Sequence, residues 1–132
     1  MKKITLTNFE VLNIVAGIQQ EIFANKESEF SLKFAWKLRK NTKILANLNE
    51  AINEKLAELE RPYADDEHSE AAEDGNRQIK QEYALEFAQK RNELYALENE
   101  VEINMATVDE IGAEKISPNV LNLLSFMLED DE

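Results

Sequence analysis

The residue types best suited to chemistry lie together in one acidic segment in the middle of the chain, residues 63–76. This segment carries six carboxylates, no lysine or arginine, and the one histidine of the chain. Carboxylate oxygens and imidazole nitrogens bind divalent cations, and histidine is the commonest general acid or base in enzymes. Two hypotheses follow, a cation site and acid–base catalysis, and both would use Asp65, Asp66, Glu67 and His68.

The spacing of these residues argues against both hypotheses. A calcium loop of the EF-hand type needs glycine at its sixth position, where Glu70 would stand if Asp65 were the first ligand. His68 and Ser69 are neighbours in a polar loop, which gives a base and a nucleophile no fixed geometry. The chain has no phosphate-binding glycine loop, paired-histidine motif or nucleophile elbow, and it has no cysteine. We therefore expect a solvated connection, no catalytic residue, no metal, no cofactor and no enzyme activity.

Two periodic apolar stretches flank the acidic segment. Before it, Leu45, Ile52 and Leu59 recur every seven residues, which is the spacing of a coiled-coil seam, and Pro62 then supplies a stop. After it, Asn76 could cap a second helix over residues 77–100. A connection of this length favours antiparallel neighbours. The sequence thus predicts a long, coiled-coil-like antiparallel helical hairpin over residues 31–100, with its acidic tip at 63–76.

The two ends of the chain predict a small base for this hairpin, made of residues 1–30 and 101–132. Residues 2–6 and 101–106 alternate apolar and polar side chains, so they could pair as a short two-stranded β ribbon. Thr7 and Glu10 have the spacing of a capping box that opens a helix over residues 8–24. Ser117 and Pro118 are a cap and first residue for a short C-terminal helix. We expect one mainly α-helical domain over residues 1–132.

The charge and composition restrict the class of partner. The net charge of −12 opposes general binding to the phosphates of nucleic acid and favours a partner with a basic surface. No apolar run approaches the roughly 20 residues that span a bilayer, and no secretory segment follows Met1. The expectation is a soluble protein of the cytoplasm that neither enters a membrane nor binds nucleic acid in general.

One basic segment stands out within this acidic chain. Five lysines and arginines occur between residues 33 and 43, and no acid occurs between Phe30 and Asn49. Lys33, Lys37 and Lys40 share a helical face close to Trp36. The segment either contacts nucleic acid or an acidic protein surface, or pairs with acids elsewhere in the fold such as residues 129–132. The candidate partner-binding residues are therefore Lys33, Trp36, Lys37, Lys40, Asp65, Asp66 and Glu67.

The layout of the whole chain resembles a family of proteins. An opening Leu6-Thr-Asn-Phe-Glu-Val-Leu12 is followed by Phe30-Ser-Leu-Lys-Phe-Ala-Trp-Lys-Leu-Arg-Lys-Asn41, and the chain closes with Ile116-Ser-Pro-Asn-Val-Leu-Asn-Leu-Leu124. This arrangement is similar to an uncharacterised family of small proteins from tailed bacteriophages and prophages of Gram-positive bacteria. The resemblance implies a phage accessory protein in the host cytoplasm, and it carries over no catalytic residue.

Together these features predict a non-enzymatic protein that acts by protein–protein interaction. It would bind and inhibit a host protein, or assist phage assembly, and its exposed apolar stripes predict association with a partner helix or as a homo-oligomer. The alternative is a nucleic-acid-associated regulatory protein that uses the basic segment 33–43.

Overall fold

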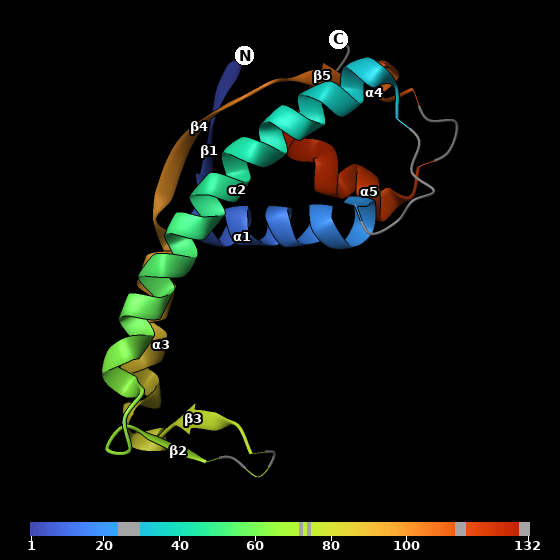
Figure 1. Cartoon of the computed structure of the whole chain (residues 1–132). Helices are drawn as coiled ribbons and strands as arrows, with labels where there is room; N and C mark the ends of the chain where they lie inside the picture. The colour runs from blue at the N-terminus through green and yellow to red at the C-terminus, as the bar shows by residue number, and fades with distance from the viewer. Residues whose placement is uncertain (24–29, 72, 74, 113–115, 130–132) are drawn as a thin grey trace.

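The computed structural model describes residues 1–23, 30–71, 73, 75–112 and 116–129. The chain is mainly α-helical, and one long diagonal helix, α2, connects a compact upper part to a narrow lower part (Figure 1). The helices are α1 (Asn8–Gly17), α2 (Leu32–Glu60), α3 (Gln81–Ala96), α4 (Val108–Ile111) and α5 (Pro118–Leu123), with a π-helical turn at Ile18–Phe23 and 3-10 turns at Arg61–Tyr63 and Leu124–Met127. The strands are β1 (Lys2–Thr7), β2 (Ser69–Ala71), β3 (Arg77–Ile79), β4 (Glu98–Ile103), β5 (Ala106–Thr107) and β6 (Leu128–Glu129). None of the described helices has the length and apolarity needed to span a membrane.

The predicted two-stranded ribbon is present, and its second strand covers Glu98–Ile103 instead of residues 101–106. Strands β1 and β4 pair antiparallel, from Lys2 opposite Ile103 to Thr7 opposite Glu98. Their alternating pattern places Leu6, Val101 and Ile103 in the core and leaves the intervening side chains of β4 exposed. The strand begins at Glu98 and the second helix ends at Ala96, so the prediction of helix up to residue 100 is wrong by four residues.

The N-terminal helix begins as predicted. The Thr7 hydroxyl accepts a hydrogen bond from the Glu10 amide at 3.1 Å, and the Glu10 carboxylate accepts one from the Thr7 amide at 3.1 Å. This capping box orients α1 so that Val11 and Val15 enter the core, and the π-helical turn buries Ile18. The predicted end at residue 24 lies just outside the described residues.

Helix α2 carries the main apolar stripe of the molecule. Ser31 caps it, because its hydroxyl accepts from the Phe34 amide at 3.1 Å and donates to the Glu110 carbonyl at 2.5 Å. Asn41 interrupts the stripe but is fully buried, and its amide group exchanges hydrogen bonds of 2.8–3.1 Å with Asn104. The buried side of α2 is formed by Phe34, Leu38, Asn41, Leu45 and Ile52.

Helix α3 lies beside the C-terminal part of α2 (Figure 1) and is much shorter, 16 residues against 29. It begins after Lys80, so the prediction that Asn76 caps it is wrong: β3 pairs with β2 and occupies the intervening residues. At the other end, Asn8 donates its side-chain amide to the Leu94 carbonyl at 2.7 Å and its backbone amide to the Leu97 carbonyl at 2.9 Å. These bonds satisfy carbonyls that a helix end leaves open, and the chain turns into β4.

The hydrophobic core occupies the upper part of the molecule, where α1, the N-terminal half of α2, the β1–β4 ribbon and the C-terminal helical turns meet (Figure 1). Each of these elements contributes apolar side chains that no water reaches. The largest of them are Phe34, Ile18, Leu45, Ile103, Leu124 and Met127. This core holds α2 by its N-terminal half and thereby fixes the direction in which its outer face points.

Candidate partner-binding surfaces

The outer face of the N-terminal half of α2 forms a ridge of apolar and basic side chains. Residues of a helix advance by about 100° each, so positions 32, 36, 39, 40 and 43 point away from the stripe at 34, 38, 41 and 45. Leu32 is 87% exposed and Trp36 is 54% exposed, which is unusual for side chains of this size. We call this surface the Trp36 ridge, and it consists of Leu32, Trp36, Arg39, Lys40 and Lys43.

Two cations lie over the indole ring of the Trp36 ridge. The Arg39 guanidinium carbon is 5.8 Å from the ring centroid, and the Lys40 ammonium nitrogen is 5.3 Å from it. Cation–π contacts of this kind contribute about 0.5–1 kcal/mol at exposed sites. Among the described residues, no carboxylate lies within ion-pair distance of Arg39, Lys40 or Lys43. The ridge therefore presents uncompensated positive charge around a large apolar ring.

Lys37 belongs to the fold rather than to the ridge. Its ammonium group donates to the Glu110 carboxylate at 2.8 Å and to the Met105 carbonyl at 2.9 Å. The hydrogen bond to the carboxylate is the main reason why the pKa of Glu110 is lowered. Lys33 lies 3.9 Å from the same carboxylate and is 70% exposed. The face expected to join Lys33, Lys37 and Lys40 is thus divided between a structural ion pair and the ridge.

The acid that answers Lys37 was not identified from the sequence. The sequence points to residues 129–132 as partners, but Glu129 makes no such pair and residues 130–132 lie outside the described part of the chain. Glu110 carries a local signal, because Thr107 and Glu110 have the spacing of a helix cap, and Thr107 does cap α4. That signal predicts a helix start but not which lysine packs against it. Arg39 and Lys43 belong to the predicted basic segment 33–43, whereas Leu32 was missed as a surface candidate.

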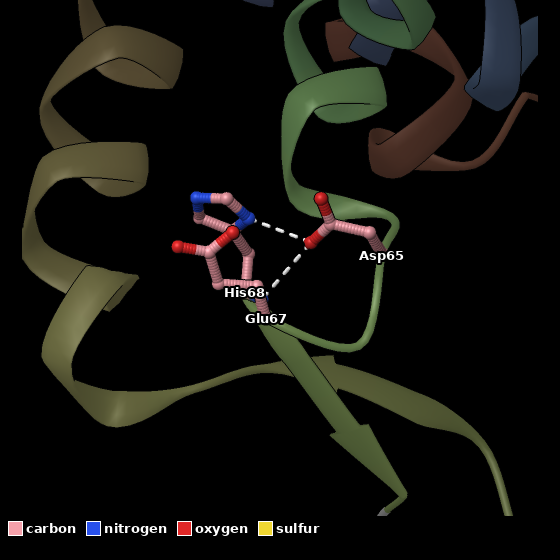
Figure 2. A group of neighbouring side chains, drawn as sticks. All are labelled: Asp65, Glu67 and His68. Atoms are coloured by element: carbon pink, nitrogen blue, oxygen red, sulfur yellow. Dashed lines mark hydrogen bonds and ion pairs between the residues drawn. The ribbon is translucent and has the colours of Figure 1, made fainter.

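The acidic segment brings Asp65, Glu67 and His68 close together (Figure 2). One Asp65 carboxylate oxygen accepts from the His68 backbone amide at 3.0 Å and lies 2.6 Å from His68 Nδ1. These bonds lower the pKa of Asp65, and the side-chain bond to His68 is the main cause. One ligand atom from each of the three residues lies within 4.8 Å of the others. Zinc takes about four ligands and calcium six or more, so this group would supply only part of a shell.

The segment around His68 is folded: residues 64–67 are exposed, as expected of a solvated connection, but Tyr63, His68 and Ser69 pack against the rest of the protein. Tyr63 and Ser69 are buried, and the Ser69 hydroxyl donates to the Tyr63 carbonyl. The His68 ring packs against Tyr83 with centroids 4.6 Å apart, and Tyr63 meets Phe87 edge-to-face at 5.4 Å. Aromatic rings at the end of α2 and on α3 need cover from water, and the turn provides it. We call the group formed by Tyr63, His68, Ser69, Tyr83 and Phe87 the aromatic joint.

The remaining acids of the segment divide between internal pairs and solvent. Asp66 accepts from the Arg77 guanidinium at 2.7 Å across the β2–β3 hairpin, and both side chains are well exposed. Glu67 is exposed, and its carboxylate makes no hydrogen bond in the described part of the chain, while its backbone amide donates to the Asp65 carboxylate. Because Asp65 bonds to His68 and Asp66 pairs with Arg77, the three predicted acidic contact residues are not equivalent. Of these three residues, only Glu67 presents a carboxylate that no described neighbour pairs with.

Comparison of the chain with models of protein families, with curated proteins and with solved structures finds no match. The choice between the candidate surfaces therefore depends on geometry and charge alone. The Trp36 ridge combines large exposed apolar area with charge that nothing in the described fold compensates. The Asp65–His68 group, in contrast, uses its polar atoms to hold its own turn.

Proposed function

We propose that this chain is a non-enzymatic accessory protein, of the phage type that its layout resembles, which binds a host or phage protein through the Trp36 ridge. The observation that carries the proposal is the half-exposed indole of Trp36 with Arg39 and Lys40 over its ring. Binding would either inhibit the partner or assist an assembly step. The proposed place of action is the cytoplasm of the host cell.

The composition of the ridge supports this function on energetic grounds. Tryptophan and arginine are the residues most enriched where binding energy concentrates, because they bury a large area and can also form directed polar contacts. The ridge is positive while the whole chain carries −12, so it would attract an acidic patch on the partner and repel a basic one. The acidic face at Asp65, Asp66 and Glu67 would instead attract a basic surface. We propose that the partner has an acidic patch and that this patch binds the ridge.

The proposal includes a finer view of the architecture. Residues 31–100 would act as a coiled-coil-like hairpin with its tip at 63–76, carried on a base of residues 1–30 and 101–132. Support comes from the seven-residue series in α2, in which Leu45 and Ile52 are buried and Leu59 is partly buried. In this view the base holds the N-terminal half of α2, which carries the ridge, and the rest of the hairpin extends away from it as a spacer.

Pairwise tests with matched variants distinguish the ridge from other exposed apolar positions. Trp36→Ala removes the proposed contact, and Leu85→Ala removes a side chain of comparable exposure, 72%, on α3. The tagged protein, produced during infection, should recover a specific protein that is lost with Trp36→Ala and kept with Leu85→Ala. The recovered protein should then bind purified wild-type chain at least tenfold tighter than Trp36→Ala. Equal recovery by the two variants, or recovery of no specific protein, would contradict the proposal.

A nucleic-acid-associated regulator is the second candidate, and the absence of acids between residues 30 and 49 favours it. Phosphate binding by lysine and arginine weakens steeply as salt rises. Single- and double-stranded oligonucleotides should then bind at low ionic strength, and the combined change of Lys40 and Lys43 to Glu should abolish binding. No binding at low ionic strength, or binding that this change leaves intact, would exclude the candidate.

A further inference from the structure

Strand β1 has one unpaired edge. It pairs with β4 along one side, and no other described strand adjoins it. The hydrogen bond from the Asn8 amide to the Leu97 carbonyl fixes the phase of this ladder, because Asn8 and Leu97 stand opposite each other. In an antiparallel pair every second residue bonds to the partner strand. The amides and carbonyls of Lys3 and Thr5 therefore point to the open edge.

A hollow of about 480 Å³ lies beside this edge, on the side that faces the core. It opens between β1, α1 and the C-terminal helical turns, and this volume is within the range of sites that bind ligands. Its mouth carries polar residues, including Glu10 and Asn13. Its apolar walls are formed by Ile4, Leu6, Ile14, Leu123 and Phe126. Since Ile4 and Leu6 alternate with Lys3 and Thr5 along β1, the open edge and the hollow belong to one strand.

The exposed face of the β1–β4 ribbon carries more negative than positive charge, with three glutamates of β4 against Lys3 of β1. The exposed face of β4 carries Glu98, Glu100 and Glu102, opposite Thr7, Thr5 and Lys3 of β1. A strand added to β1 would lie two strand spacings from β4, roughly 10 Å, which is about one Debye length at physiological salt. Such a strand would feel the attraction of this row for positive charge. Glu10 at the mouth of the hollow adds to it.

We propose that the open edge of β1 and the adjoining hollow bind an extended segment of a partner protein in which apolar residues alternate with lysine or arginine. The segment adds to β1 as a third strand, and its backbone pairs with the amides and carbonyls of Lys3 and Thr5. Its apolar side chains enter the hollow, and its basic side chains lie on the face that carries the β4 glutamates. This surface is separate from the Trp36 ridge, and it selects a partner of the opposite charge.

A second copy of the chain fits this edge poorly. Pairing β1 with itself would place the two rows of glutamates three strand spacings apart and would join two chains of −12 net charge each, so repulsion opposes it. The alternating basic segment meets no such repulsion. Self-association at β1 is therefore the outcome that would overturn the choice of occupant.

Synthetic peptides test the proposal directly. The probe is a nine-residue fluorescent peptide of alternating valine and lysine, compared with a peptide of the same composition in block order and with an alternating valine–glutamate peptide. Fluorescence anisotropy should give at least tenfold tighter binding for the first peptide than for either control. NMR amide shifts should be largest at Lys3 and Thr5. Equal binding of the block-order peptide would mean that charge alone acts, and it would overturn the proposal.

Two substitutions separate the edge from the hollow. Thr5→Pro removes the outward amide and is tolerated on an edge strand, while Thr5→Val keeps the amide and serves as its control. We expect at least a tenfold loss of affinity with Thr5→Pro and no change with Thr5→Val. Asn13→Trp fills the mouth of the hollow from α1 without touching the ladder, and it should weaken binding while Asn13→Ala does not.

Thermal unfolding confirms that each variant is folded before it is compared. If Thr5→Pro fails to fold, Asn13→Trp and the amide shifts decide the outcome. Binding that is unchanged in Asn13→Trp, and in a folded Thr5→Pro, would refute the proposal. A wild-type dimer in sedimentation velocity that Thr5→Pro converts to monomer would assign the edge to a second copy instead.

Discussion

Asn41 interrupts the apolar stripe of α2, and Asn104 satisfies its polar atoms. The Asn41 side chain accepts from the Asn104 amide at 2.8 Å and donates to the Asn104 carbonyl at 3.0 Å. Asn41→Ala would leave both partly buried backbone groups of Asn104 without this partner, at about 1–3 kcal/mol each. We expect the free energy of unfolding in urea to fall by at least about 2 kcal/mol. The exposed Asn53→Ala should change it little, and similar values for the two variants would contradict the assignment.

The ion pair between Lys37 and Glu110 should make stability depend on pH. The pKa of Glu110 is lowered in the folded chain, chiefly by the hydrogen bond from Lys37. A carboxylate with a lowered pKa stabilises the fold above its unfolded pKa, and this contribution disappears as the pH falls through the folded pKa. Lys37→Met should therefore be less stable than wild type at neutral pH, and the difference should shrink below about pH 4. Urea unfolding across this range measures it, and a difference that does not vary with pH would contradict the role.

The contact between the end of α4 and the start of α2 depends on a glycine with a left-handed backbone conformation. Gly112 has φ +71°, and a Cβ there would lie 2.8 Å from Ser31 Cβ and 3.2 Å from Ser31 N. The Ser31 amide donates to the Ile111 carbonyl at 2.9 Å, so the crowding would disturb the cap of α2. Gly75, at φ +86°, has no atom of the described residues, its chain neighbours aside, within 4 Å of such a Cβ.

These two glycines form a matched pair for experiment. Gly75→Ala should cost only the left-handed strain of about 1–2 kcal/mol, and Gly112→Ala should cost clearly more because the clash adds to it. Thermal unfolding measures both. An equal loss of stability would show that the contact with Ser31 is not tight.

Elements whose signals are local could be predicted from the sequence. The caps at Thr7 and Ser117 depend on residues three positions away, and the structure places both helix starts there. The start of α3 could not be found in this way, because β2–β3 pairing and the cover over Tyr63 involve residues far from Asn76. The same applies to the site: the basic run was visible, but only packing shows that Lys37 pairs with Glu110 and that Arg39 and Lys40 lie over Trp36.

At the scale of the whole molecule, the excess of acidic residues should weaken the fold. The chain has 27 acidic and 15 basic residues, so its net charge is −12. The excess carboxylates repel one another when the chain is compact. Added salt screens this repulsion over distances of about 10 Å at 0.1 M. We expect the midpoint of thermal unfolding to rise when sodium chloride is increased from low to physiological concentration, and potassium chloride to act equally. A fall in the midpoint would show that attractive ion pairs outweigh the repulsion.

The uninterrupted course of α2 sets a fixed spacing within the molecule. Trp36 and Glu60 lie on the same helix, 24 residues apart, and at 1.5 Å per residue this separates them by about 36 Å along its axis. The ridge and the aromatic joint therefore lie near opposite ends of one helix, at a fixed distance from each other. One small globular partner could not touch both ends, whereas two partners could be held at a constant distance. Inserting or deleting one helical turn would change that distance by about 5.4 Å.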